Sequence, residues 1–118
     1  MKQATEVLDS FESNIYCMHT FTRGLRDFAI LKPILEEREK EALTSLLAET
    51  DYANPDIDTE VRKFRCQEIS IVVKYLKQKY RDKKVSTDNI PKNYEDYWHG
   101  HHSFKDALMF VSDCQRRL

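Results

Sequence analysis

Glycine is scarce in this chain, and its scarcity constrains the fold more than any other feature. Gly24 and Gly100 are the only two glycines among 118 residues, and the chain has only three prolines. A domain built on many tight β-turns needs residues that adopt positive φ, which glycine does most readily. The sequence therefore predicts an all-α fold, a small bundle of about four helices with a central antiparallel hairpin.

Size and composition predict a single helical domain, residues 1–118. A chain with 41% hydrophobic and 33% charged residues can bury one modest core and stay soluble. No apolar run approaches the roughly 18 residues of a membrane span, and the first residues lack a signal-peptide pattern. Three widely spaced cysteines, Cys17, Cys66 and Cys114, suit reduced thiols. We therefore expect a cytoplasmic protein that does not bind membranes.

Apolar residues recur three and four positions apart over residues 8–29, from Leu8 and Phe11 through Ile15 to Leu25. This spacing predicts one long amphipathic helix. Glycine in a helix interior costs up to about 1 kcal/mol relative to alanine. We therefore expect any bend or break of this helix to fall near Gly24.

Two further helices are predicted on either side of a turn at residues 51–58. Proline is favoured at the first position of a helix, so the second helix should begin at Pro33 and run to about Glu49. Asp56 or Asp58 is the expected N-cap of the third. Because the connecting turn is short, the two helices should form the central antiparallel hairpin.

The sequence predicts an exposed face for the second helix and a buried face for the third. In the second, the glutamates are expected to form a solvated acidic face; they are Glu36, Glu37, Glu39 and Glu41. In the third, the residues at helical spacing that are expected to mark the inward face are Val61, Arg65, Ile69, Val72, Leu76 and Tyr80, with Phe64, Ile71 and Val73 widening the apolar face.

The C-terminal third contains a loop and a last predicted helix. Turn-forming residues precede an aromatic cluster of Tyr94, Tyr97 and Trp98. From Ser103 onward, helical spacing returns and predicts a helix over residues 103–118 that closes the core.

The histidines after the aromatic cluster are the best candidates for chemistry. His99, His101 and His102 place three imidazoles within four residues, and neutral imidazole binds transition metals. Their spacing matches no zinc motif, and the segment is predicted to be a loop. We therefore expect solvent-exposed histidines without a metal, and keep a metal-dependent enzyme only as the least favoured alternative.

Other catalytic arrangements are also missing from the sequence. Cys17 lies beside Met18 and His19, but neighbouring residues of a helix point about 100° apart, so the thiol and the imidazole cannot readily meet as a nucleophile and base. Cys66 and Cys114 lie on apolar stripes. Two glycines leave no room for a phosphate-binding loop. We predict no enzymatic activity, no cofactor and no small-molecule substrate.

Charge is segregated along the predicted hairpin. Residues 36–60 hold nine acids against two bases, and residues 62–84 hold nine bases against two acids. Lys74, Lys77, Arg81 and Lys84 follow helical spacing, so they could contact a phosphate backbone or an acidic protein. Alternatively, the bases gather where the helix dipole favours them and pair with the acidic second helix.

The segment from Leu31 to Lys84 combines PILEEREKE, a short Asp/Asn/Pro turn and EVRKFRCQEI. In this order it resembles the helical-hairpin accessory proteins of tailed bacteriophages. The resemblance covers residues 31–84 and carries no diagnostic motif or functional residue. It implies a viral accessory or inhibitor protein in a host cytoplasm.

Together these observations predict a non-catalytic protein-interaction or assembly module. Its partner is expected to be another protein or further copies of the same chain. The predicted partner-binding residues are Lys74, Lys77, Arg81, Lys84, Tyr94, Tyr97 and Trp98. The alternative is a nucleic-acid-binding accessory protein that uses the basic residues of the third helix.

Overall fold

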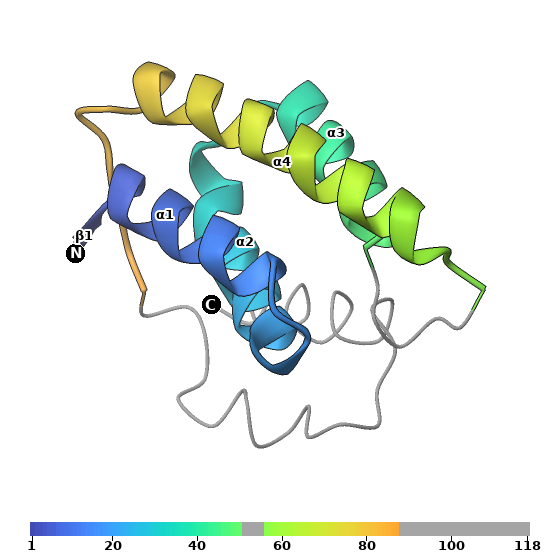
Figure 1. The fold of residues 1–118 in the computed structure, drawn as a ribbon. Coiled ribbons are helices and arrows are strands. Elements are labelled where there is room, and N and C mark those ends of the chain that lie inside the picture. Colours follow the sequence, from blue (N-terminus) through green and yellow to red (C-terminus); the bar gives the residue numbers. More distant parts are fainter. Residues whose placement is uncertain (51–55, 88–118) are drawn as a thin grey trace.

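The computed structural model describes residues 1–50 and 56–87 of the chain (Figure 1). Within these ranges the fold is a small all-α bundle of four α-helices. In chain order the elements are β1 (Lys2–Gln3), α1 (Ala4–Ile15), η1 (Met18–Thr20), α2 (Phe21–Leu31), η2 (Lys32–Ile34), α3 (Glu37–Ala48), α4 (Thr59–Lys79) and β2 (Lys84–Val85). The all-α prediction is confirmed, whereas the predicted helix at residues 103–118 lies outside the described residues.

The first predicted helix is two helices, because the chain turns between Ile15 and Phe21. The 3-10 turn η1 separates α1 from α2. The Thr20 hydroxyl donates a 3.0 Å hydrogen bond to the Asn14 carbonyl, which satisfies a backbone oxygen at the end of α1. The prediction of a single helix was therefore wrong. It was made because apolar residues keep helical spacing through this turn in the sequence.

Gly24 lies within α2 and does not mark a break. A Cβ atom at this position would lie 2.6 Å from Ile15 Cδ1 and 3.3 Å from the Ile15 backbone nitrogen. The lack of a Cβ atom at Gly24 therefore allows the close approach of α2 to the end of α1, and it does not produce a bend. The expectation of a break near Gly24 was wrong for this reason.

The packing of α1 against α2 is the most extensive contact between elements of the described fold. Phe11 and Phe28 meet with ring centroids 6.1 Å apart, and both side chains are fully buried. Asp27 of α2 is also buried, and it accepts hydrogen bonds of 2.7 Å from Ser10 Oγ and 3.0 Å from Asn14 Nδ2. A buried carboxylate needs such partners to offset its lost hydration.

The second predicted helix starts later than expected. Pro33 lies in the 3-10 turn η2, and α3 begins at Glu37 behind a capping box. In this box the Glu39 side chain accepts a 2.8 Å hydrogen bond from the Glu36 backbone N–H. At the other end, the Thr50 hydroxyl donates to the Leu47 carbonyl at 2.9 Å. Proline therefore marks the approach to the helix, and Glu36 is its N-cap.

The third predicted helix is confirmed as α4, with Asp58 as its N-cap. The Asp58 side chain accepts a 2.9 Å hydrogen bond from the Glu60 backbone N–H. In Figure 1, α4 crosses in front of α3 and runs alongside α1, and α4 has contacts with both helices. Arg65 on α4 bonds the Glu49 carboxylate just beyond α3. That α3 and α4 form a central antiparallel hairpin stays a prediction.

A small sheet of two strands, each two residues long, joins the start of the chain to the segment after α4. Lys2 pairs with Val85 and Gln3 with Lys84 in antiparallel register. The Ala4 N–H adds a 2.9 Å hydrogen bond to the Lys83 carbonyl, and Val85 is buried in the common core. Strands this short carry no periodic signal, so the sequence could not predict them.

Candidate interaction surface

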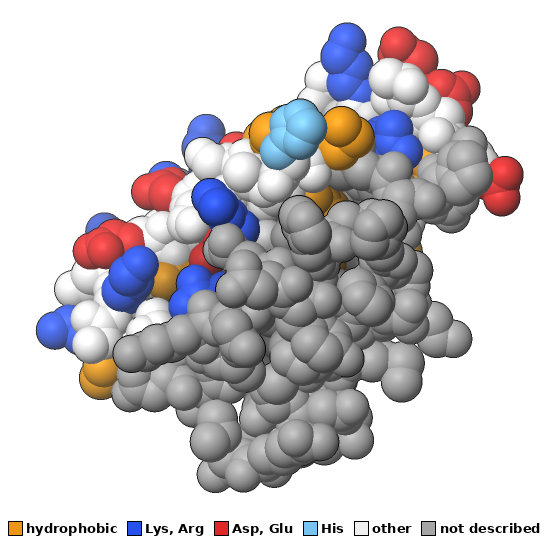
Figure 2. Space-filling view, turned by 90° about the horizontal axis from the view of Figure 1, so that it is seen from below, with side chains coloured by type: hydrophobic (Ala, Val, Ile, Leu, Met, Phe, Trp, Pro, Cys, Tyr) orange, Lys and Arg blue, Asp and Glu red, His pale blue; other side chains and the backbone are white. Residues whose placement is uncertain are grey.

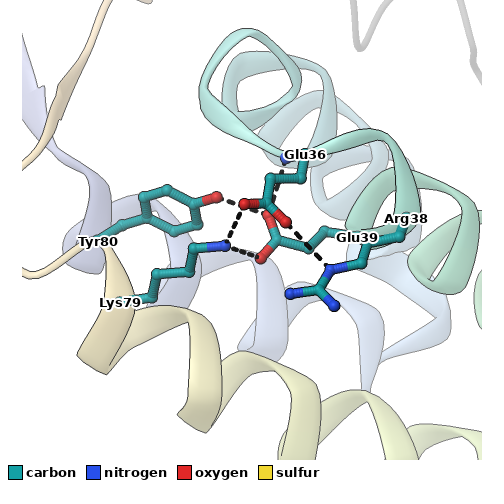
Figure 3. A network of polar contacts seen from close by, with 5 residues as sticks. All are labelled: Glu36, Arg38, Glu39, Lys79 and Tyr80. Atoms are coloured by element: carbon teal, nitrogen blue, oxygen red, sulfur yellow. Dashed lines mark hydrogen bonds and ion pairs between the residues drawn. The ribbon is translucent and has the colours of Figure 1, made fainter.

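A polar cluster with two buried members, Glu39 and Tyr80, joins the start of α3 to the end of α4 (Figure 3). Glu39 is only 6% exposed, and it accepts hydrogen bonds of 2.8 Å from Lys79 Nζ and 2.5 Å from the Tyr80 hydroxyl. Lys79 Nζ also lies 2.9 Å from Glu36, whose other carboxylate oxygen pairs with Arg38. The expected solvated acidic face is therefore wrong for Glu39, which is an internal partner of α4.

The electrostatics of this cluster favour the charged forms of its acids and its lysine. Burial disfavours ionised Glu39, but hydrogen bonds from Lys79 and Tyr80 outweigh it and leave the pKa of Glu39 below its ordinary value. Hydrogen bonds to Glu39 and Glu36 raise the pKa of Lys79 well above its ordinary value. Burial, and then Glu39, raise the pKa of Tyr80. Through their hydrogen bonds to Glu39, Lys79 and Tyr80 therefore link the end of α4 to α3.

The predicted basic residues do not form one stripe on the helix. The helix ends at Lys79, so only Lys74 and Lys77 lie on α4, while Arg81 follows it and Lys84 lies in β2. Lys77 Nζ pairs with Asp9 of α1 at 2.6 Å. Lys74, Arg81 and Lys84 are exposed. Pairing of bases with the acidic second helix occurs at Lys79 and Arg65, whereas Lys77 instead pairs with α1.

Surface charge is mixed on the face seen in Figure 2. There, Lys and Arg side chains are interspersed with Asp and Glu over the part of the surface that is described. This face presents no broad field of one sign within those residues, so it offers little attraction to a polyanion.

The predicted aromatic and histidine sites lie outside the described residues. This applies to Tyr94, Tyr97 and Trp98, and to His99, His101 and His102. Across residues 1–50 and 56–87, no three His, Cys, Asp or Glu side chains are grouped to hold a metal ion. The expectations for the histidine loop therefore stay predictions.

The two described cysteines differ in environment. Cys66 is buried, as its apolar stripe predicted, and burial raises the pKa of its thiol. Cys17 is exposed at the start of η1, where hydrogen bonds from the His19 backbone N–H and the Thr20 side chain lower the pKa of its thiol. Cys17 thus lies in a turn between helices, not within a helix as expected.

The outward side of α4 carries all the large exposed apolar side chains of the described α-helices. Phe64 is 61% exposed, Ile71 70%, Tyr75 50% and Val61 38%. These four residues are called the outer face of α4. The prediction that Val61, Phe64 and Ile71 help to form the core face was wrong, because the opposite side of the helix is buried by Cys66, Ile69, Val73 and Leu76.

Comparison with known proteins finds no relative from which a role could be carried over. No protein-family model, no curated protein and no solved structure matches the chain. The resemblance of residues 31–84 to phage accessory proteins therefore stays a prediction. Among the helices in the described ranges, none is long and apolar enough to cross a membrane.

Proposed function

We propose that this chain is a non-catalytic protein-interaction module that binds its partner through the outer face of α4. The observation that carries the proposal is the exposure of Phe64, Ile71 and Tyr75 on one side of a single well-capped helix. Folded domains bury most side chains of this size, and apolar residues grouped on a surface mark sites of association.

The spacing of the outer face suits recognition by another protein. Counted from Val61, the apolar residues fall three, ten and fourteen positions along the helix. An amphipathic helix that lies against a protein groove or a second helix presents anchors in this way. Aromatic anchors such as Phe64 and Tyr75 bury large areas at little entropic cost, so they are typical hot-spot residues.

This proposal includes the assembly, viral-accessory and inhibitor roles that the sequence suggests, because each of them needs only an exposed complementary surface. The cytoplasmic location is likewise part of the proposal. A nucleic-acid-binding role is the second candidate. Exposed Lys74, Arg81, Lys83 and Lys84 near the end of α4 support it.

In-cell cross-linking with quantitative mass spectrometry tests the proposal. The doubly substituted variant Phe64→Ser/Ile71→Ser removes the two most exposed anchors of the outer face, and both sites tolerate polar residues because they already face water. The matched control is Glu41→Ser/Ala48→Ser, two exposed positions on α3.

We expect the wild-type protein and the control to cross-link the same proteins, and the outer-face variant to lose them. If all three proteins cross-link the same set, α4 is not the interaction surface. Circular dichroism of each variant confirms that the helices are intact.

A further inference from the structure

The outer face of α4 has the heptad spacing of a contact between two helices. Phe64 follows Val61 by three residues, Ile71 follows by seven more, and Tyr75 by four more. Residues at these a and d positions align along one side of a helix and pack against a partner helix. The remaining position in the series is Glu68, whose carboxylate bonds Arg65 of the same chain.

One flank of the outer face carries unused charges of opposite sign. Glu60, Gln67 and Lys74 lie seven residues apart on this flank, and all three are exposed. Neither Glu60 nor Lys74 forms an ion pair with another residue of the described part of the chain. The flank is therefore acidic at one end, polar at its centre and basic at the other.

The other flank is already used within the chain. Arg65 bonds Glu49, and Lys79 bonds Glu36 and Glu39. The α3 side of α4 thus carries satisfied charges. On the opposite side, Glu60 and Lys74 lie at g positions beside the outer face, whereas exposed Lys63 lies further round the helix at a c position. Glu60 and Lys74 are therefore the charges that help to select what binds the outer face.

The charges on this flank of α4 are complementary to those of a second α4 that runs in the opposite direction. Gln67 lies seven residues from both Glu60 and Lys74, so two antiparallel α4 helices centred on Gln67 place each Glu60 opposite Lys74 of the other copy. In a parallel pair, Glu60 would lie beside Arg65 of the other copy and Lys74 beside Lys79, so one attractive contact is cancelled by one repulsive contact. Charge complementarity therefore favours an antiparallel pair.

We propose that a second copy of this chain occupies the outer face of α4, with the two α4 helices antiparallel. This inference rests on the proposed function and names its partner. Four apolar side chains on one helix form less than a standard interface of about 1,600 Å², so the dimer is weak. We expect a dissociation constant on the order of 10–100 µM.

Sedimentation equilibrium of the purified full-length chain over a range of concentrations tests this. The wild-type protein is expected to shift from monomer to dimer as its concentration rises. Ile71→Ser removes the most exposed apolar side chain of the face from both copies, and it should abolish the shift. Ala48→Ser, at an exposed position of α3, should leave the shift unchanged.

Charge exchange tests the antiparallel arrangement. Glu60→Lys places two lysine pairs across the interface, and Lys74→Glu places two glutamate pairs, so each variant alone should dimerise about tenfold more weakly. An equimolar mixture of these two variants restores both attractive pairs, and so does the double variant. Both should regain wild-type association, which a mere folding defect could not do.

Three outcomes would overturn the inference. They are a wild-type chain that stays monomeric at every concentration, a dimer indifferent to Ile71→Ser, and a mixture of charge variants that associates no better than either alone. None of them decides the proposed function, because the cross-linking experiment still reports whether a different protein binds the outer face.

Discussion

Glu39 is the residue whose removal we expect to cost most at the contact between α3 and α4. It is 6% exposed, and Glu39→Ala leaves Lys79 and Tyr80 without this shared acceptor. Removing a buried acceptor that a lysine and the buried Tyr80 hydroxyl share leaves polar groups unsatisfied, so we expect a loss of about 1–3 kcal/mol. Urea denaturation followed by circular dichroism measures it.

Glu37 provides the matched control for this prediction. It lies in the same first turn of α3, but its side chain is exposed and its ion pair, with Lys40, is on the surface. Glu37→Ala should cost less than about 1 kcal/mol. Equal losses for the two variants would show that the cluster adds nothing beyond the helix dipole.

Asp27 and Glu39 are expected to affect stability with opposite dependence on pH. Burial raises the pKa of Asp27 despite hydrogen bonds from Ser10 and Asn14, whereas the pKa of Glu39 is lowered. Ionised Asp27 therefore weakens the fold as pH rises above its unfolded pKa of about 3.9. Glu39 stabilises the fold above its unfolded pKa of about 4.3, and this contribution is lost as pH falls through its lower folded pKa.

Two amide substitutions test these signs. We compare the free energy of unfolding of each variant with that of the wild type. For Asp27→Asn this difference should be more favourable at pH 7 than at pH 3, because the substitution removes a charge penalty that exists only when Asp27 is ionised. For Glu39→Gln the difference in the free energy of unfolding should be less favourable at pH 7 than at pH 3, because ionised Glu39 stabilises the fold. Denaturation curves at both pH values measure the differences, and parallel responses of the two variants would contradict the assignment.

At the scale of the elements, Gly24 is expected to control how closely α2 crosses α1. Gly24→Ala gains about 1 kcal/mol of helix propensity, but its Cβ would lie 2.6 Å from Cδ1 of Ile15, which is only 1% exposed. Overpacking costs about 1–3 kcal/mol, so we expect a net loss of stability. Thermal denaturation measures it.

A double-mutant cycle with Ile15→Val separates this clash from other effects. Ile15→Val deletes Cδ1 and alone should cost about 0.5–1.5 kcal/mol. In the double variant the Cβ of residue 24 gains room, so the combined loss should be smaller than the sum of the single losses. Strict additivity would mean that Gly24 is not needed for the close approach.

Local signals at the element scale predicted α4 and its cap well, but they could not locate the turn between α1 and α2. Asp58 is followed by a clear helical pattern, so its capping role was visible in the sequence. The turn at η1 depends on the Thr20 to Asn14 hydrogen bond, and apolar residues keep helical spacing across it. Periodicity reports spacing alone, so it cannot distinguish one long helix from two that fold back.

The same limit of periodicity explains the error at the outer face of α4. Phe64 and Ile71 share the apolar character of Ile69 and Val73, and a helix with apolar residues on two sides looks like one with a wide core face. Only the positions of α1 and α3 decide which side is covered. The candidate site was therefore present in the sequence as residues, but its exposure was not.

At the scale of the whole molecule, long-range ion pairs divide the basic residues into two groups. Glu36 and Glu39 bind Lys79, and Asp9 binds Lys77, although these partners lie far apart in the sequence. Charge segregation along the chain predicted that bases of α4 pair with acids of α3, as Lys79 does. It did not predict the pair of Lys77 with Asp9, because no local pattern in the sequence links Asp9 to α4. Lys74, Arg81, Lys83 and Lys84 are the exposed bases left near this end of the helix.

This division predicts how the chain responds to nucleic acid. With a net charge of -1 and four exposed bases near the end of α4, binding to a short DNA duplex should be weak and lost near 150 mM salt. Fluorescence anisotropy at several salt concentrations should give a slope of log K against log salt no steeper than about -3.6, the value for four phosphate contacts.

Two variants then decide whether the bases act as separate groups or as one stripe. Arg81→Ala/Lys84→Ala removes two exposed cations and should flatten that slope by about 2, for every DNA sequence alike. Lys77→Ala should leave the slope unchanged, because the Lys77 ammonium already lies 2.6 Å from Asp9. If Lys77→Ala instead flattens the slope by about 1, Lys77 exchanges Asp9 for a phosphate when nucleic acid binds. The basic residues would then act as one continuous nucleic-acid surface, and this outcome would favour the second candidate function over the first.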